Sequence, residues 1–289
     1  MPRVYLTPQT LEPGIRGEEF SLDMETAKKL TRVLRLTPGE MFIAFDGLGG
    51  EWDCALVASS AVSSRDEGDD APQARTGRKN PPSGKNPPSA KSVRAVVIGE
   101  RQTKPQGRLH LSVAQAIPKG DKMDWVLQKG TELGVAEFWP FQAARSVPVL
   151  DNGERATGRT ERWRKIAQAA AAQCGRADVP IVHAIGEFAT VVDAGTRDGG
   201  RCFMLDELGE VDALRAALRR EPLQWDDDRE VQTRVMLLVG PEGGWTPRER
   251  EWAERYGAES VGLGRLVLRT ETAALVAAAV LQWEAGELG

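Results

Sequence analysis

Short apolar runs alternate with amphipathic segments from about residue 108 to the end of the chain. The runs are rich in Val, Leu and Phe, a composition typical of strands that are buried on both faces. Strands are predicted at Leu109–Ala114, Val135–Trp139, Phe203–Glu207, Val235–Val239 and Ser260–Leu263. Because they alternate with helical segments, we expect an α/β fold with a mostly parallel sheet flanked by helices.

Helices are predicted from the 3-to-4 spacing of apolar residues and from end signals. The expected helices are Asp121–Leu133, about Arg162 to Cys174, Val211–Leu218, one after Thr246 and one from about Thr270. In the second of these, the apolar face consists of Trp163, Ile166, Ala167, Ala170 and Cys174. In the first, Lys119, Lys122 and Lys129 lie on or near the helix, where they face either RNA or solvent.

The first 60 residues have shorter runs, separated by Pro-Gly and Gly-rich turns. Strands are predicted at Arg3–Leu6, Met41–Phe45 and Trp52–Ala58, and the pattern resumes at Val93–Ile98. This spacing suggests a small β-barrel or sandwich. A helix is expected from about Asp23 to Leu34, with Leu30, Val33 and Leu34 toward the core.

Residues 60–92 are polar, rich in Ser, Gly and Pro, and contain Lys-Asn-Pro-Pro-Ser twice. Such a segment has too few apolar groups to bury, so we expect a flexible low-complexity insertion between two strands. A tethered basic arm for RNA is the alternative.

The stretch from Val235 to Leu281 contains the strongest candidate site. The strand at its start ends in Gly240-Pro241-Glu242-Gly243-Gly244, where the exposed backbone allows a ligand to approach closely. Thr246, Pro247 and Glu249 predict a capped helix start, and Gly257 its end. A second loop, 263–269, also joins a strand to a helix.

Ligands of open α/β sheets bind beyond the carboxyl ends of strands, so two such loops together favour a binding pocket over plain structural turns. The loops match neither the dinucleotide fingerprint nor the phosphate-binding loop.

Composition excludes several classes of protein. The 289 residues suggest one or two domains, no apolar run approaches the ~20 residues of a membrane span, and the start lacks a signal-peptide core. Three dispersed cysteines and two histidines predict neither a disulfide framework nor a metal site, which favours a cytoplasmic protein.

The net charge is −4, which is unusual for a simple nucleic-acid binder. A local cluster between Arg155 and Arg176 is basic, with Glu161 as its one acid. This cluster fits RNA phosphates or a solvated helix face.

Two motifs closely resemble the ribosomal RNA small subunit methyltransferase E family, which are 16S rRNA (uracil-N3)-methyltransferases of the SPOUT class. They are LVGPEGGWTPRERE and LGRLVLRTETA, in the family's order and separation. GDKMDWVLQKGTELGVAEFWPF, the Gln173–Arg176 ending and the Arg32–Leu36 run are also similar.

The resemblance implies a PUA-like β-barrel RNA-binding domain at 1–100 and a SPOUT methyltransferase domain at 105–289. It further implies a trefoil knot in the second domain, a homodimer, and methylation of a 16S rRNA uridine, position 1498 by family, in the small ribosomal subunit. The implied cofactor is S-adenosyl-L-methionine, and no metal is required.

The cofactor residues implied by the resemblance are Leu205, Val239, Gly240, Glu242, Gly243, Gly244, Leu263, Gly264, Val267, Leu268 and Thr270. Leu205, Leu263 and Leu268 would sandwich the adenine. The catalytic candidates are Arg269, as an electrostatic group, and Glu271, which orients Arg269, acts as a base, or only stabilises its helix. The RNA-binding candidates are Arg32, Arg35, Arg145, Gln173 and Arg176.

Two other functions remain open at this stage. A SPOUT-like ribose 2′-O-methyltransferase would share the fold but modify a sugar hydroxyl. A non-catalytic RNA-binding or assembly factor would have no need of the intact glycine loop and the RTETA run.

Overall fold

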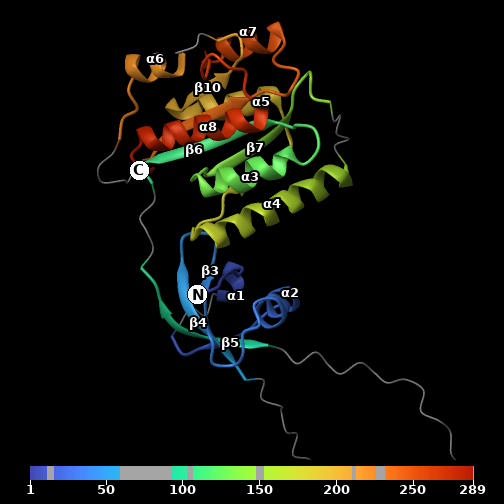
Figure 1. The fold of residues 1–289 in the computed structure, drawn as a ribbon, viewed down its shortest axis with the longest axis vertical. Coiled ribbons are helices and arrows are strands. Elements are labelled where there is room, and N and C mark those ends of the chain that lie inside the picture. The colour runs from blue at the N-terminus through green and yellow to red at the C-terminus, as the bar shows by residue number, and fades with distance from the viewer. Residues whose placement is uncertain are drawn as a thin grey trace, which may run out of the picture. The chain divides into compact units, whose positions relative to one another are not determined.

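A parallel sheet of seven strands organises the C-terminal part of the chain, and a five-stranded sheet organises the N-terminal part (Figure 1). The computed structural model describes residues 1–11, 16–58, 93–102, 107–147, 153–209, 213–225 and 232–288. These residues form two compact units, Met1–Ala44 with Trp52–Arg101 and Phe45–Glu51 with Gln102–Gly289. The predicted insertion at 60–92 lies outside the described residues.

The N-terminal sheet has the order β1-β3-β4-β5-β2. Its strands are β1 (Arg3–Tyr5), β2 (Glu19–Ser21), β3 (Met41–Phe45), β4 (Glu51–Val57) and β5 (Arg94–Glu100). The pairs β4–β5 and β2–β5 are antiparallel. Phe42, Leu6 and Leu30 are among the side chains of its core. The short β2 and the helix α1 (Pro8–Leu11) were not predicted, because three or four residues carry too little periodicity.

The helix predicted from Asp23 to Leu34 divides into two parts. Asp23 caps α2 (Met24–Lys28), and the chain continues as a π-helical turn, η1 (Lys29–Val33). Leu30 is buried as expected, but Val33 and Leu34 are exposed, which corrects the prediction. The wider π turn changes the rotation per residue, so the positions after Leu30 no longer follow the α-helical face.

The C-terminal sheet has the order β12-β10-β11-β6-β7-β8, and β9 pairs with β7. Its strands are β6 (Leu109–Ala116), β7 (Glu137–Gln142), β8 (Ile181–Val182), β9 (Gly186–Glu187), β10 (Arg201–Leu205), β11 (Thr233–Val239) and β12 (Ala258–Val261). All of their pairings are parallel. The predicted α/β fold with a parallel sheet is therefore confirmed, whereas the trefoil knot stays a prediction.

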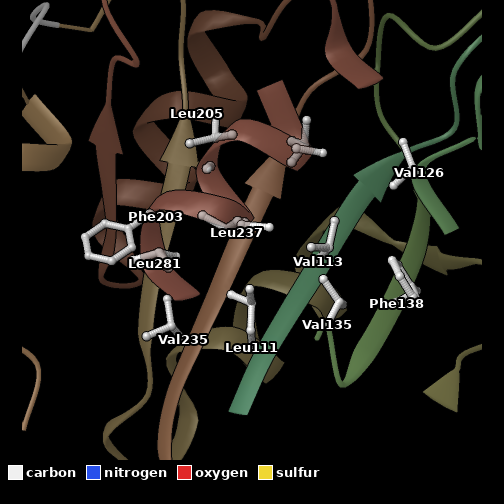
Figure 2. Close-up of a cluster of buried hydrophobic side chains, with 14 of the residues drawn as sticks. Leu111, Val113, Val126, Val135, Phe138, Phe203, Leu205, Val235, Leu237 and Leu281 are labelled. Atoms are coloured by element: carbon white, nitrogen blue, oxygen red, sulfur yellow. The ribbon is translucent and has the colours of Figure 1, made fainter. Parts of the chain in front are cut away.

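Successive side chains of these strands point to opposite faces of the sheet and pack into two hydrophobic layers. On β10 and β11, Phe203, Leu205, Val235 and Leu237 enter one layer, and Cys202, Met204, Met236 and Leu238 enter the other. Figure 2 shows the first layer, in which Leu281 of a helix packs with the strand residues. Burial on both faces explains why the strands have continuous apolar sequences.

The first layer is covered by α3 (Lys122–Glu132), α4 (Glu154–Cys174), α6 (Ala213–Arg220) and α8 (Thr270–Glu284). The second is covered by α5 (Phe188–Thr196) and α7 (Pro247–Arg255). Helix α5 was missed in the sequence. Helix α4 begins before Arg162, and Cys174 at its end is exposed rather than part of the apolar face. Asp121 precedes α3 but makes no side-chain capping bond.

No helix in the part of the chain that the structure describes is both long and apolar enough to cross a bilayer.

Candidate functional site

A cavity of about 680 Å³ lies at the carboxyl ends of β10, β11 and β12. Three loops supply most of its lining: 205–209 after β10, 239–245 after β11 and 261–270 after β12. Lys122 of α3 and Ala273 of α8 complete the lining. The position agrees with the general rule for ligands of open α/β sheets. All predicted cofactor residues except Gly243 line this cavity.

Trp245 holds the glycine loop against the neighbouring strand. Its indole Nε1 donates a hydrogen bond of 2.8 Å to the carbonyl oxygen of Leu205. A Cβ atom on Gly240 would lie 2.9 Å from the Trp245 ring, so a glycine is needed at that position for the indole to pack. The loop after β11 is thus attached to the end of β10, and together they form one rigid wall.

The helix after the glycine loop begins as predicted. Thr246 and Glu249 form a complete capping box at the start of α7, with Pro247 at its first position. The second carboxylate oxygen of Glu249 accepts a hydrogen bond of 2.9 Å from the backbone nitrogen of Ala144. Glu249 therefore also fixes the loop after β7 beside the glycine loop.

Arg145, a predicted RNA contact, lies behind the glycine loop. Its Nη1 atom donates to the carbonyl oxygens of Gly243, at 2.9 Å, and Trp245, at 3.3 Å. A Cβ atom on Gly243 would lie 3.1 Å from Cβ of Arg145. Gly243 thus faces Arg145 and is not among the residues that line the cavity, and its part in cofactor binding stays a prediction. Sequence spacing could not show this, because Arg145 and Gly243 are 98 positions apart.

Thr270 joins the glycine loop to helix α8 and to strand β6. Its hydroxyl donates a hydrogen bond of 2.6 Å to the carbonyl oxygen of Gly240. It accepts one of 2.8 Å from Nε2 of Gln115, which is fully buried. Gln115 was not predicted as a site residue, since a polar residue at the end of an apolar strand was the sole signal.

Glu271 pairs with Lys122 rather than with Arg269. The Nζ atom of Lys122 lies 3.5 Å from Oε2 of Glu271 and 2.8 Å from Oε1 of Glu242. The hydrogen bond to Glu242 raises the pKa of Lys122. Burial raises the pKa of Glu242, but bonds from Lys122 and backbone nitrogens outweigh it, and the net pKa is lowered. Lys122 and Glu242 are therefore both charged at neutral pH.

Arg269 precedes α8 and lines the cavity with an exposed side chain. Glu271 contacts Lys122, and its orientation of Arg269 stays a prediction. Leu266 and Val267, in the same loop, are each 81% exposed, so the predicted cofactor residue Val267 borders the cavity with most of its side chain in solvent.

The wall after β10 is held by an ion pair. Asp206 has a side chain that is only 2% exposed, and Arg250 of α7 binds both of its carboxylate oxygens. Oδ1 also accepts a hydrogen bond of 3.0 Å from the backbone nitrogen of Leu208. The next residue, Glu207, lines the cavity. Neither acid was predicted as a site residue.

The remaining RNA candidates have different surroundings. Arg176 is engaged within the protein, since its Nη1 atom donates to the carbonyl oxygens of Thr131, at 3.0 Å, and Val135, at 2.8 Å. Its side chain is 16% exposed. Gln173 is exposed near the end of α4. Arg32 and Arg35 are exposed in the N-terminal unit, and Arg35 has a φ of 57°, rare for a residue other than glycine.

The cavity fits S-adenosylmethionine in size and in chemistry. Its volume is in the usual range for small-molecule sites, and Leu205, Leu263 and Leu268 give it apolar surface for an adenine. Bare backbone at Gly240, Gly244 and Gly264 adds hydrogen-bonding groups. Lys122 and Glu242 present opposite charges at the edge, which suits the amino-acid end of such a molecule.

Comparisons with known proteins point in the same direction. Residues 105–282 match the RNA methyltransferase domain, and residues 27–61 match the RNA methyltransferase PUA domain. Ribosomal RNA small subunit methyltransferase E of Bacillus subtilis is 30% identical over 285 residues, covering 97% of this chain and 95% of the relative. The protein of the same name from Mycobacterium bovis is 30% identical over 248 residues, covering 85% and 79%.

A solved structure of ribosomal RNA small subunit methyltransferase E from Neisseria gonorrhoeae, bound to S-adenosyl methionine, is also similar. It is 30% identical, with a TM-score of 0.73, over 98% of this chain and 97% of that one.

Proposed function

This chain belongs to the ribosomal RNA small subunit methyltransferase E family, and from that premise we propose that it methylates N3 of a uridine in 16S rRNA. S-Adenosylmethionine supplies a methyl group on a sulfonium, which leaves as a neutral thioether. The observation that carries the proposal is the cavity in which the glycine loop and the 263–270 loop meet. The family implies position 1498, and we further propose that the protein acts on 16S rRNA of the small ribosomal subunit in the cytoplasm.

The protein's first task is to hold the methyl donor in line with the uridine nitrogen. The glycine loop is fixed by Trp245, Arg145 and Thr270, so the wall that would position the donor is rigid before binding. Positioning of this kind can supply ~7–11 kcal/mol of the barrier. In the transfer, the N3–C bond forms while the S–C bond breaks, and the N3 proton must leave.

Arg269 is the group that we place beside the developing charge on the uracil. Its side chain is exposed at the cavity, and no described side chain forms an ion pair with it. A cation at that position stabilises a uracil that has lost its N3 proton. Glu271 forms an ion pair with Lys122, whose Nζ atom lies 3.5 Å from its Oε2 atom, and its carboxylate is the group that we propose as acceptor of the N3 proton.

RNA contacts are proposed on both units. Arg32 and Arg35 lie with Lys28 and Lys29 in one exposed basic segment of the N-terminal unit, and Gln173 is exposed on α4. The arginine and lysine side chains would contact phosphates. Because the guanidinium groups of Arg145 and Arg176 are bonded within the protein, we propose that these two shape the RNA-binding surface through the loops that they hold.

A homodimer is proposed with α8 in the interface. Val276, Val280 and Trp283 are exposed along this helix at 39%, 41% and 67%, at spacings of four and three. Leu266 and Val267 add exposed apolar surface in the loop before it. Exposed large apolar side chains in such number on one helix and its preceding loop support a protein interface.

The function is tested by methyl transfer from labelled S-adenosylmethionine to small ribosomal subunits that lack the modification. Digestion to nucleosides then identifies the product. We expect 3-methyluridine. A 2′-O-methylated nucleoside would agree with the fold but would contradict N3 as the target atom. RNA binding without any labelled nucleoside would support a non-catalytic assembly factor.

A further inference from the structure

A carboxylate without a known role stands at the cavity. Glu207 lines the cavity directly after the buried Asp206, and its side chain is exposed there. Asp206 is fully engaged by Arg250 and the backbone nitrogen of Leu208. No ion pair or hydrogen bond joins the Glu207 carboxylate to any other residue that the structure describes. Its acceptor atoms are therefore available to a molecule in the cavity.

The position of this carboxylate is built into the fold. A Cβ atom on Gly244 would lie 2.4 Å from Oε1 of Glu207, so a side chain at position 244 would displace the carboxylate. Gly244 also has a φ of +66°, a conformation that disfavours other residues. Beneath Glu207, the Asp206–Arg250 ion pair fixes the loop to α7. The Asp206–Arg250 pair thus restrains the backbone next to Glu207, and the missing side chain at Gly244 leaves room for its carboxylate.

The chemistry of the cavity assigns a partner to Glu207. Leu205, Leu263 and Leu268 offer apolar surface for the adenine, while Lys122 and Glu242 offer both charges that a zwitterionic amino acid needs. Glu207 is a lone acceptor group, and the part of the cofactor that remains is a ribose with two hydroxyl donors. An acid just past the carboxyl end of a strand is a recurrent partner for ribose hydroxyls in α/β sheets.

We propose that Glu207 accepts hydrogen bonds from the ribose hydroxyls of the cofactor and so selects a ribonucleoside in this cavity. The inference rests on the proposed function, because it takes S-adenosylmethionine as the ligand. It concerns binding rather than methyl transfer. The readout is therefore the affinity of the product-like ligand S-adenosylhomocysteine, measured by calorimetry on the full chain.

The experiment combines three protein variants with three ligands. The proteins are the unmodified chain, Glu207→Ala, Glu207→Gln and, as a matched control on exposed α7, Glu251→Gln. The ligands are S-adenosylhomocysteine and its 2′-deoxy and 3′-deoxy analogues. Hydrogen bonds to a charged group predict that at least one deoxy analogue binds the unmodified chain about 10- to 100-fold more weakly.

Glu207→Ala should weaken the binding of S-adenosylhomocysteine by a similar factor. In this variant the deoxy analogue should bind less than about threefold more weakly than S-adenosylhomocysteine itself. The affinity of Glu207→Gln for S-adenosylhomocysteine should lie between those of the unmodified chain and Glu207→Ala, since an amide oxygen still accepts a neutral hydrogen bond. Glu251→Gln should match the unmodified chain. Thermal unfolding without ligand checks that each variant is folded.

Three results would overturn the inference. The first is equal affinity of the unmodified chain for all three ligands, which needs no variant. The second is an undiminished deoxy penalty in Glu207→Ala. The third is a Glu207→Ala effect that disappears with 5′-methylthioadenosine, because that ligand keeps the ribose and lacks the amino acid. Absence of S-adenosylhomocysteine binding by the unmodified chain would instead contradict the proposed function itself.

Discussion

The Nζ atom of Lys122 lies 3.5 Å from Oε2 of Glu271 and links the start of α3 to the first turn of α8. The same ammonium group donates to Glu242 of the glycine loop. One cation therefore joins three segments around the cavity. Arg269 is left with no carboxylate partner among the described side chains. Arg269 and Glu271 of the RTETA run therefore have different surroundings.

We predict that Arg269→Ala lowers the rate of methyl transfer about 10²- to 10³-fold, as for other lost electrostatic groups in active sites. Affinity for S-adenosylhomocysteine should change less than about threefold. Single-turnover transfer and calorimetry measure the two quantities. Arg219→Ala, on the exposed end of α6, is the control for loss of one positive charge. Equal losses of rate and affinity would remove Arg269 from the chemistry.

The Lys122–Glu271 pair should appear as a coupling in a double-mutant cycle. Lys122→Ala, Glu271→Gln and the double variant are compared by urea unfolding. A partly exposed pair predicts a coupling free energy of about 0.5–1 kcal/mol. Strictly additive changes in the free energy of unfolding would show that the two groups do not interact in solution.

The Thr270 hydroxyl should stabilise the cavity through both of its bonds. Thr270→Val keeps the shape of the side chain but leaves the buried Gln115 amide and the Gly240 carbonyl without this partner. We expect a loss of about 1–3 kcal/mol in the free energy of unfolding and weaker binding of S-adenosylhomocysteine. Thr270→Ser retains the hydroxyl and should lose under about 1 kcal/mol. Similar losses for both variants would assign the effect to packing.

The lowered pKa of Glu137 should make the free energy of unfolding depend on pH. Its carboxylate accepts hydrogen bonds from the Nε2 atoms of His110, at 2.8 Å, and His183, at 2.7 Å, and these bonds lower the pKa of Glu137 well below its usual range. A lowered pKa in the folded state contributes stability above the unfolded value, near 4.5, and this contribution is lost as the pH falls.

Urea unfolding at several pH values between 7 and 4 tests this effect. The free energy of unfolding should decrease more steeply below about pH 5 in the unmodified chain than in Glu137→Gln, whose amide does not titrate. Identical slopes in the two proteins would mean that other carboxylates account for acid sensitivity.

The sequence alone predicted those parts of the site that are formed by residues close together in the chain. The capping box of Thr246 and Glu249 is present with both of its bonds, and the loops around Gly240 and Leu263 meet in one cavity. Capping and turn chemistry depend on four or five consecutive residues, so they can be recognised without a structure. The parallel order of the strands followed from their alternation with helices.

Contacts between distant segments could not be predicted in this way. Glu271 is 149 positions from Lys122, and Gln115 is 155 positions from Thr270, so no spacing pattern connects them. The exposure of Val33 was missed for a different reason, because a π-helical turn changes the face on which a residue lies. Arg176 resembled an RNA contact by its motif, whereas its hydrogen bonds hold the backbone after α3.

The hydrogen bond between Gln115 and Thr270 has a consequence for the synthesis of the protein. Strand β6 comes first among the strands of the C-terminal sheet and α8 follows all of them, so the bond from Gln115 to the cavity residue Thr270 joins early and late segments of this part of the chain. A growing chain can pair β6 with β7 early, but it has no complete cavity until α8 has left the ribosome. Cofactor binding therefore requires that α8 has been synthesised, and fragments truncated before Thr270 should fail to bind the cofactor.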